Sequence, residues 1–355
     1  MEIGIDSFAG APFDDGDAYD APQSARAMAE LLERMVLAEE VGLDSFGIGQ
    51  HFRKAFLDSS PALILTAAAA RTRRIRLSSA VTVLSVADPV RAFQDFATLD
   101  LISEGRAEMV VGRGSFTDGF PLFGLDLKDY DTVFAEKLGL LLEIRENEFV
   151  TWSGQFRPAL HNQPIYPRPL QDPLPIWLGV GGTQSSFVRA GKLGLQLMTG
   201  VLAGKLSRIR PNIDLYEQTY LEAGHPPEEM KVGIHGLGFV AETTEQAHEA
   251  YFPGYVTMFN GLSKERGWKE VNRRTFEKQV GPEGALLVGN PEEVAQKIIR
   301  HAEAVGEISR LTFNMDNPGM SHENLMRSIE LIGTRVIPLV KKMGSLGNKG
   351  ANRHT

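Results

Sequence analysis

Cysteine is absent from this chain of 355 residues. Its absence excludes disulfide bonds, thiolate metal sites and a cysteine nucleophile, and it favours a reducing compartment. Long apolar runs are missing as well: no stretch approaches the length that crosses a bilayer, and the sequence does not open on a basic segment followed by an apolar one. From these absences we expect a cytoplasmic protein without a membrane partner.

Blocks of positive charge are also missing. The chain has 45 acidic and 37 basic residues, which give a formal net charge of −8 spread along its length. Proteins that bind nucleic acid concentrate Lys and Arg to neutralise the phosphate backbone, so we expect no nucleic-acid partner.

Several motifs that identify common catalytic sites are missing. The chain has no Walker A sequence, no HExxH pair, and no early G-x-G-x-x-G that follows a strand and opens a helix. Its histidines include no pair with the spacing of metal ligands, so we predict no metal site. The sequence therefore disfavours the common nucleotide-binding folds.

What the sequence does have is a regular alternation of two patterns. Apolar residues that recur every three or four positions predict helices, and short runs rich in β-branched and aromatic residues predict strands between them. These runs lie at residues 3–8, 45–51, 75–84, 107–112, 175–180, 195–200, 232–240 and 308–315. Strands that alternate with helices pair in parallel through right-handed crossovers, and this series favours an α/β fold with a (β/α)8 TIM barrel over an open sheet.

Capping residues mark four helix starts. Ser60, Asp88 and Asn290 each precede a proline, which suits the first position of a helix. Thr243 and Gln246 have the spacing of a capping box.

The composition shows no break within residues 1–341, so we predict a single domain there. Residues 342–355 are rich in Gly, Lys and Asn, which predicts a flexible tail. The connections at residues 149–172 and 250–289 are longer than a barrel unit needs. We expect both as insertions at the carboxyl-terminal face, where such barrels keep their chemistry, with residues 260–284 as a lid.

The first candidate site is the turn in WLGVGGTQSS, residues 177–186. Gly181 and Gly182 let backbone N–H groups approach an anion, and Ser185 lies at the start of a predicted helix, whose N-terminus attracts negative charge. An ordinary capped turn also fits this pattern. The position late in the β/α series favours a phosphate.

Arg113 is the second candidate, at the carboxyl end of a predicted strand between Gly112 and Gly114. An arginine there can bind a phosphate through two hydrogen bonds, and the alternative is a surface arginine in a turn. Arg106 lies at the amino end of the same strand, which predicts a structural role.

Two histidines are candidates for proton chemistry. His51 follows the second predicted strand in GQHF, as either a proton carrier or a hydrogen-bonded packing residue. His235 lies within a predicted strand and could point into the mouth of the barrel.

These segments, in this order, resemble the bacterial luciferase family of flavin-dependent monooxygenases. The similarity is densest over residues 80–126, AVTVLSVADPVRAFQDFATLDLISEGRAEMVVGRGSFTDGFPLFGLD, which match the luciferase α-subunit in register without gaps. Weaker matches include AEEVGLDSFGIGQHF, PIWLGVGGTQSS, GNPEEVA and LMRSIELIGTRVIPLV. The resemblance implies a barrel that binds reduced FMN, or in some branches the deazaflavin F420, and that oxygenates a substrate through flavin C4a-peroxide chemistry.

The resemblance also implies roles for single residues. Arg113 matches the phosphate-binding arginine, and Gly182 and Ser185 match the turn that contacts the phosphate. Ser115 and Phe116 match flanking cofactor contacts.

The flavin ring is implied to lie near four further positions. Ala80 and Val81 match a non-prolyl cis peptide beneath the ring. Gly112 replaces a cysteine of luciferase, which removes a thiol and is expected to open space. Gln50 stands where luciferase has its reactive histidine, and a glutamine can donate a hydrogen bond but cannot exchange a proton near neutral pH. His51 takes the neighbouring place.

The function that the resemblance implies is an FMNH2-dependent monooxygenase that uses O2 on a small organic substrate. A separate flavin reductase would supply the cofactor, because the chain shows no second nucleotide motif. An F420-dependent oxidoreductase of the same fold and a non-catalytic flavin-binding protein stay open as alternatives. His235 lies near a substrate-binding position of the alkanesulfonate monooxygenase branch, which suggests a role in the pocket. The family usually forms dimers through early barrel helices, so we expect a homodimer.

Overall fold

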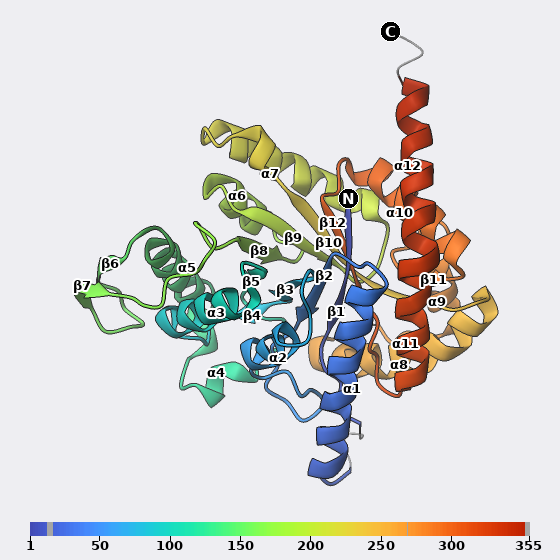
Figure 1. The fold of residues 1–355 in the computed structure, drawn as a ribbon, viewed down its shortest axis with the longest axis horizontal. Helices are drawn as coiled ribbons and strands as arrows, with labels where there is room; N and C mark the ends of the chain where they lie inside the picture. Colours follow the sequence, from blue (N-terminus) through green and yellow to red (C-terminus); the bar gives the residue numbers. More distant parts are fainter. Residues whose placement is uncertain (13–16, 268, 352–355) are drawn as a thin grey trace.

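The computed structural model describes residues 1–12, 17–267 and 269–351. Eight parallel strands close into a barrel that is surrounded by helices (Figure 1). The strands are β1 (Glu2–Ser7), β2 (Ser45–Ile48), β3 (Arg76–Ser79), β5 (Ala107–Gly112), β8 (Ile176–Val180), β9 (Gln196–Val201), β10 (Val232–Val240) and β12 (Arg310–Asn314). Strand β12 pairs with both β10 and β1, which closes the ring and confirms the predicted barrel.

The helices cover the outside of the barrel with their apolar faces. They are α1 (Ala21–Glu40), α2 (Pro61–Ala69), α3 (Pro89–Ser103), α4 (Gly119–Leu122), α5 (Tyr130–Glu146), α6 (Gln184–Lys192), α7 (Arg210–Glu222), α8 (Thr244–Arg266), α9 (Arg273–Val280), α10 (Pro291–Val305), α11 (His322–Leu331) and α12 (Ile337–Ala351). In β5, Met109 and Val111 face the helices, whereas Val110 joins Trp177 and Met198 in a cluster inside the barrel. Successive side chains of a strand point to opposite faces. The strands therefore contribute to two apolar cores, one between the barrel and the helices and one inside the barrel.

Each of the predicted strand runs overlaps a barrel strand, and two of them match β5 and β10 at both ends. The run at 75–84 is instead divided into β3 and β4 (Thr82–Val83), with a cis peptide bond between Ala80 and Val81, as the resemblance implied. Ser78 pairs with Glu108 and Thr82 with Val111, so this chain has one more residue than β5 between the paired positions. The expected single strand was therefore wrong, because the extra residue interrupts the ladder.

The capping predictions hold at three helices of four. Asp88 accepts hydrogen bonds from the backbone N–H groups that open α3, and Asn290 does the same at α10. Thr243 and Gln246 form the predicted capping box of α8. Ser60 occupies the N-cap position of α2, but its side chain makes no capping hydrogen bond.

The segment at residues 149–172 forms a hairpin of β6 (Phe149–Trp152) and β7 (Leu160–Pro164) beside α5, at the edge of the molecule (Figure 1). None of its residues lines the cavity described below. The expectation of an insertion at the carboxyl-terminal face was wrong for this segment, because it follows helix α5 rather than a strand. It therefore leaves the barrel at the amino-terminal side.

The segment at residues 250–289 continues α8, adds α9, and returns through β11 (Leu287–Gly289), which pairs with β10. Tyr251, Tyr255 and Phe276 form a separate apolar cluster here. Met258 and Phe259, just before the expected lid, line the cavity. The lid at 260–284 stays a prediction, and residue 268 lies outside the described residues.

The chain ends on α12, which reaches Ala351 and projects beyond the barrel (Figure 1). A π-helical turn, Ile332–Val336, joins it to α11, and short 3₁₀ turns lie at Leu127–Asp129, Leu206–Ile209 and Pro227–Glu229. Residues 352–355 lie outside the described residues, so the flexible tail stays a prediction.

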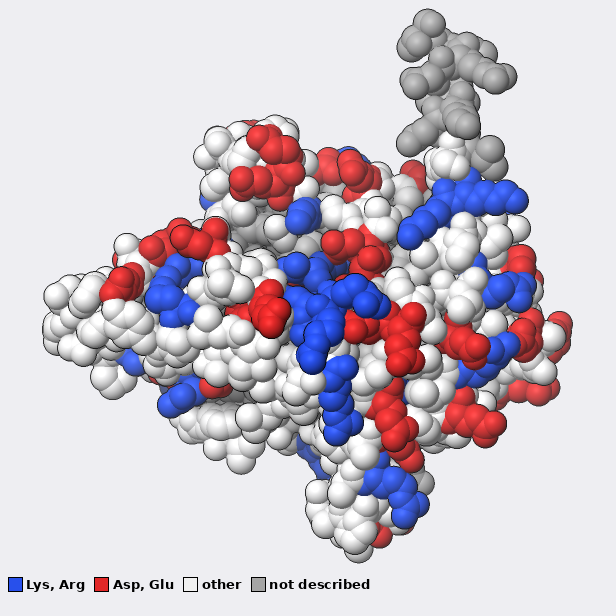
Figure 2. Space-filling model, in the orientation of Figure 1, with Lys and Arg blue, Asp and Glu red and all other residues white. Residues whose placement is uncertain are grey.

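The surface carries both signs of charge. Figure 2 shows Lys and Arg side chains interspersed with Asp and Glu over one face of the molecule. In the part of the chain that the structure describes, no helix combines the length and apolar character that a bilayer span requires. Leu63 on helix α2 is 73% exposed. The homodimer stays a prediction.

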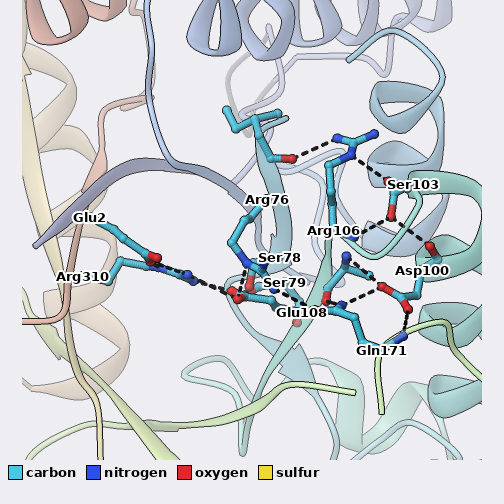
Figure 3. A network of polar contacts seen from close by, with 12 residues as sticks. Glu2, Arg76, Ser78, Ser79, Asp100, Ser103, Arg106, Glu108, Gln171 and Arg310 are labelled. Atoms are coloured by element: carbon cyan, nitrogen blue, oxygen red, sulfur yellow. Dashed lines mark hydrogen bonds and ion pairs between the residues drawn. The ribbon is translucent and has the colours of Figure 1, made fainter. Parts of the chain in front are cut away.

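A buried ion-pair network fills the amino-terminal end of the barrel interior (Figure 3). Glu108 accepts hydrogen bonds from Arg76 and Arg310, and Arg310 also pairs with Glu2. Burial by itself raises the pKa of the Glu108 carboxyl, but the two guanidinium groups outweigh it and hold the pKa below its ordinary value. The network connects β1, β3, β5 and β12 across the barrel.

Arg106 has the predicted structural role. Its guanidinium donates to the backbone carbonyls of Ala69, Thr72, Ile75 and Ser103. Figure 3 shows Arg106 beside Ser103. It does not line the cavity.

Replacing Glu108 tests the network. We expect Glu108→Gln to lower the free energy of unfolding by about 3 kcal/mol or more, because it leaves the buried Arg310 and the partly buried Arg76 without their shared carboxylate. Chemical denaturation measures the loss. Glu292→Gln is the matched control, since its half-exposed pair with Arg335 should cost less than about 1 kcal/mol. Equal losses in the two variants would show that the network does not stabilise the barrel.

Candidate active site

A cavity of about 350 Å³ opens among the carboxyl-terminal ends of the barrel strands. Much of its wall is apolar, with Phe8, Phe56, Phe116, Leu237 and Phe259 among the lining side chains. Polar groups lie deeper in the barrel: Ser45, Ser78, Arg310 and Thr312. A largely apolar pocket with a few polar groups is typical of a small-molecule site.

The cavity brings most of the predicted site residues together. Those that line it are Gln50, His51, Ala80, Val81, Gly112, Arg113, Ser115, Phe116, Gly181 and His235. Gly182 and Ser185 lie outside its lining, in the turn that leads into α6.

The space beside Gly112 is filled. A Cβ atom at Gly112 would lie 2.8 Å from Val81 Cγ2, and one at Gly179 would lie 2.8 Å from Val81 Cγ1. The expectation that Gly112 opens space was therefore wrong, because Val81 packs against both glycines. The two glycines let the Ala80–Val81 segment lie close to strands β5 and β8.

Arg113 extends from the end of β5 toward the start of α6. Its Nη2 atom donates to Ser186 Oγ at 3.3 Å, its Nη1 atom pairs with Asp131, and its guanidinium lies 5.1 Å from the centre of the Tyr130 ring. The two phosphate-binding candidates of the sequence, Arg113 and the 181–186 turn, are thus neighbours.

The turn before α6 has room for a ligand. A Cβ atom at Gly181 or Gly182 would have no other heavy atom within 4 Å, so packing does not require glycine at either position. Ser185 is exposed in the first turn of α6, while Ser186 is buried and contacts Arg113. An open glycine turn at a helix N-terminus suits an anion.

Arg189 is a functional candidate that the sequence reasoning missed. Burial lowers the pKa of its guanidinium and the nearby positive charge of Arg113 lowers it further, while the carboxylate of Asp131 acts in the opposite direction. Two arginines close enough to repel each other favour binding of an anion between or beside them. Its position one helical turn after Ser185 is the signal that could have found it.

His51 is held by a buried carboxylate. Asp58, which is fully buried, accepts one hydrogen bond from the His51 ring Nδ1 atom at 2.7 Å and another from its backbone N–H at 3.0 Å. Burial raises the pKa of Asp58, and the hydrogen bonds and charge of His51 act against that rise. The ring packs against Phe8, Phe56 and Phe116, with centroid distances of 4.6, 4.4 and 5.2 Å.

His235 is held in the same way, by a carboxylate at its Nδ1 atom, and it also contacts Phe8. Its Nδ1 atom lies 2.6 Å from Asp6 Oδ2, which also accepts a hydrogen bond from Thr312. The His235 ring stacks on Phe8 with 5.9 Å between centroids. The sequence reasoning missed both carboxylates: Asp6 is an acidic residue in an apolar strand, which is a usable signal, whereas Asp58 lies in a loop without periodicity.

Gln50 is tied to the backbone at both ends of its amide. Its Oε1 atom accepts a hydrogen bond from Val83 N at 2.8 Å, and its Nε2 atom donates to Ser59 O at 3.2 Å. Val83 belongs to β4, which directly follows the Ala80–Val81 segment. Gln50 therefore connects the end of β2 to the segment expected beneath a flavin ring.

Comparisons with known proteins agree with this arrangement. The family model of luciferase-like monooxygenases matches residues 8–307. An F420-dependent glucose-6-phosphate dehydrogenase of Amycolatopsis mediterranei is 30% identical over 350 residues, which cover 92% of this chain and 98% of that protein. The alkanal monooxygenase alpha chain of Photorhabdus laumondii is 22% identical over 361 residues, covering 91% and 96%. Among solved structures, the monooxygenase RslO1 from Streptomyces bottropensis superposes with a TM-score of 0.81 at 23% identity, covering 95% of this chain and 99% of that one.

Packing beside Val81 can be tested by substitution. We expect Gly112→Ala to lower the free energy of unfolding by about 1–3 kcal/mol, because the new methyl group overlaps Val81. Adding Val81→Ala should recover part of that loss in a double-mutant cycle. Gly181→Ala is the control, and in open space it should change stability by less than about 0.5 kcal/mol. A Gly112→Ala cost no larger than the control would contradict the contact.

Proposed function

The chain belongs to the family of luciferase-like monooxygenases, and on that premise we propose that it is an FMNH2-dependent monooxygenase acting on a small organic substrate. The observation that carries the proposal is the position of Arg113 beside Ser186, at one end of a largely apolar cavity. An anion anchor next to an apolar chamber suits a cofactor with a phosphate at one end and an aromatic ring at the other.

The residues present fit a flavin. Arg113, Arg189 and the open glycines 181 and 182 would hold the phosphate, since they combine two cations with a helix N-terminus that no side chain obstructs. Val81, packed on Gly112 and Gly179, would support the ring. Ser115 and Phe116 also line the cavity and would be flanking contacts.

Reduced flavin supplies two electrons with which one atom of O2 enters the substrate and the other leaves as water. The protein excludes bulk water with the aromatic side chains of the cavity wall. His51 and His235 can hold or move a proton at Nε2, because Asp58 and Asp6 occupy their Nδ1 atoms. A separate reductase is proposed to supply the reduced cofactor.

An F420-dependent oxidoreductase is the second candidate. The observation that favours it is the 30% identity to an F420-dependent dehydrogenase along nearly the full length of both chains. Both cofactors carry a phosphate and a tricyclic ring, so the anchor at Arg113 suits either one.

Anaerobic titration with FMNH2 and with reduced F420, followed by mixing with oxygen, distinguishes the candidates. The proposed monooxygenase should bind FMNH2 more tightly and consume oxygen with it. Tighter binding of F420 without oxygen consumption would support the dehydrogenase. Binding without oxidation of either cofactor would indicate a non-catalytic flavin protein, and binding of neither would overturn the proposal.

Arg113 should dominate the affinity for FMN. We expect Arg113→Gln to weaken FMN binding by about 10- to 100-fold, the equivalent of one or two charge-assisted hydrogen bonds. Quenching of FMN fluorescence measures the affinity. Arg91→Gln, which removes a largely exposed cation on α3, is the control and should bind FMN as the original chain does. Unchanged affinity in Arg113→Gln would place the phosphate elsewhere.

Gln50 is proposed to act on the flavin by positioning β4. Gln50→Leu removes both backbone hydrogen bonds, so we expect about a 5- to 10-fold loss of FMN affinity, equivalent to roughly 1 kcal/mol. Gln50→Glu keeps the acceptor for Val83 N–H and should retain more affinity. If Gln50→Leu binds FMN normally but loses oxygenation, Gln50 acts on the reaction itself.

A further inference from the structure

Two histidines in the cavity share one arrangement around Phe8. His51 and His235 lie 4.6 and 5.9 Å from the Phe8 ring, measured between centroids, and each has its Nδ1 atom on a carboxylate. A carboxylate at Nδ1 fixes the tautomer and leaves Nε2 as the working nitrogen. In the part of the chain that the structure describes, neither Nε2 atom has a hydrogen-bond partner, and both residues line the cavity.

The strand β2 has two glycines that make room for these carboxylates. A Cβ atom at Gly47 would collide with Asp6 Oδ1. A Cβ atom at Gly49 would lie 2.6 Å from Asp58 Oδ2 and 3.0 Å from His51 Cε1. Both histidine–carboxylate pairs therefore require glycine, which has no Cβ atom, at two positions of one short segment, FGIGQH.

The two pairs are not equivalent. Asp58 is fully buried and uses both oxygens on His51, through the ring and the backbone. Asp6 divides its hydrogen bonds between His235 and Thr312. His51 is therefore anchored to its carboxylate at two points, the ring and the backbone, whereas His235 shares its carboxylate with Thr312.

The remaining charged groups near the cavity are already paired. Arg310 pairs with Glu108 and Glu2, Arg113 pairs with Asp131, and Asp316 accepts from Ser7 and from the backbone N–H of Phe8. Arg53 pairs with Asp118 and lies over the Phe116 ring. None of these groups competes with His51 for a proton from a ligand.

Aromatic side chains form one wall of the cavity beside His51. Phe8, Phe56 and Phe116 pack on the His51 ring, and Phe56 also contacts Phe116 and Phe8, with 5.8 and 6.1 Å between ring centroids. Aromatic walls favour a flat ring by edge and face contacts. A flat ring with a hydroxyl group would meet both the wall and the free Nε2 atom.

We propose that the substrate is a phenol, and that His51 is a catalytic residue that takes its hydroxyl proton while Asp58 positions the imidazole. The proposal rests on the monooxygenase function proposed above. The O–H bond of the phenol breaks, an N–H bond forms at His51 Nε2, and the phenolate keeps the electron pair. The electron-rich ring then exchanges a C–H for a C–OH bond with one atom of O2, the other atom leaves as water, and reduced FMN supplies the two electrons. His235, whose ring stacks on Phe8 and which also lines the cavity, orients a second polar group of the substrate ring.

The probe is p-nitrophenol, whose absorption distinguishes the phenol from the phenolate. It is titrated against the FMN-loaded protein, and against the cofactor-free protein, over a range of pH. We expect the bound probe to ionise at a lower pH than the free probe, by about one pH unit, which corresponds to a tenfold preference for the phenolate. His51→Gln and Asp58→Asn should abolish this shift. His161→Gln, an exposed histidine on β7, should leave it unchanged.

Binding of the probe as a neutral phenol, or an unchanged shift in His51→Gln, would overturn the proposal. If Asp58→Asn does not fold, comparison of the probe's shift in the original chain and in His51→Gln still tests the proposal. If FMN fails to bind, the monooxygenase function fails, while the cofactor-free titration still reports on His51. A shift that persists in His51→Gln but disappears in His235→Gln would show that His235, and not His51, accepts the proton. That result would also overturn the proposal.

Discussion

A carboxylate enclosed inside the barrel constrains the rest of the structure. Glu108 lies where an unpaired charge would cost several kcal/mol, so it requires the guanidinium groups of Arg310 and Arg76. Arg76 lies on β3, the neighbour of β5, whereas Arg310 lies on β12, so the Arg310–Glu108 pair connects two strands that are not neighbours in the sheet. Arg310 also covers the Trp177 ring and lines the deep end of the cavity. One set of charges thus fills the amino-terminal end of the barrel and shapes the floor of the site.

At the carboxyl-terminal end of the barrel, glycines rather than charged residues shape the site. Gly47 and Gly49 admit two carboxylates that hold histidines, and Gly112 admits the side chain of Val81. Gly181 and Gly182 differ, because nothing occupies the space beside them. Glycines in the first group serve packing, whereas those in the second leave room for a ligand. This difference separates the ring-supporting wall from the phosphate end.

Much of the fold and part of the site could be predicted from the sequence. Apolar periodicity located the strands, and the resemblance to a known family brought Arg113 and the 181–186 turn together before any geometry was known. The division of the run at 75–84 could not be predicted, because it depends on the register against β5. The location of the 149–172 hairpin also depends on which end of the barrel its neighbouring helix reaches, which composition does not report.

The sequence by itself determined the order of strands and helices, most helix starts, and the residue types available for phosphate and proton chemistry. These features follow from local periodicity and capping, which act over a few residues. Only the tertiary structure decided which carboxylate holds which histidine. Asp6 and His235 are 229 positions apart, and they meet because closure of the barrel places β1 and β10 on either side of β12. No local pattern encodes that contact, since it exists only once the ring of strands is complete.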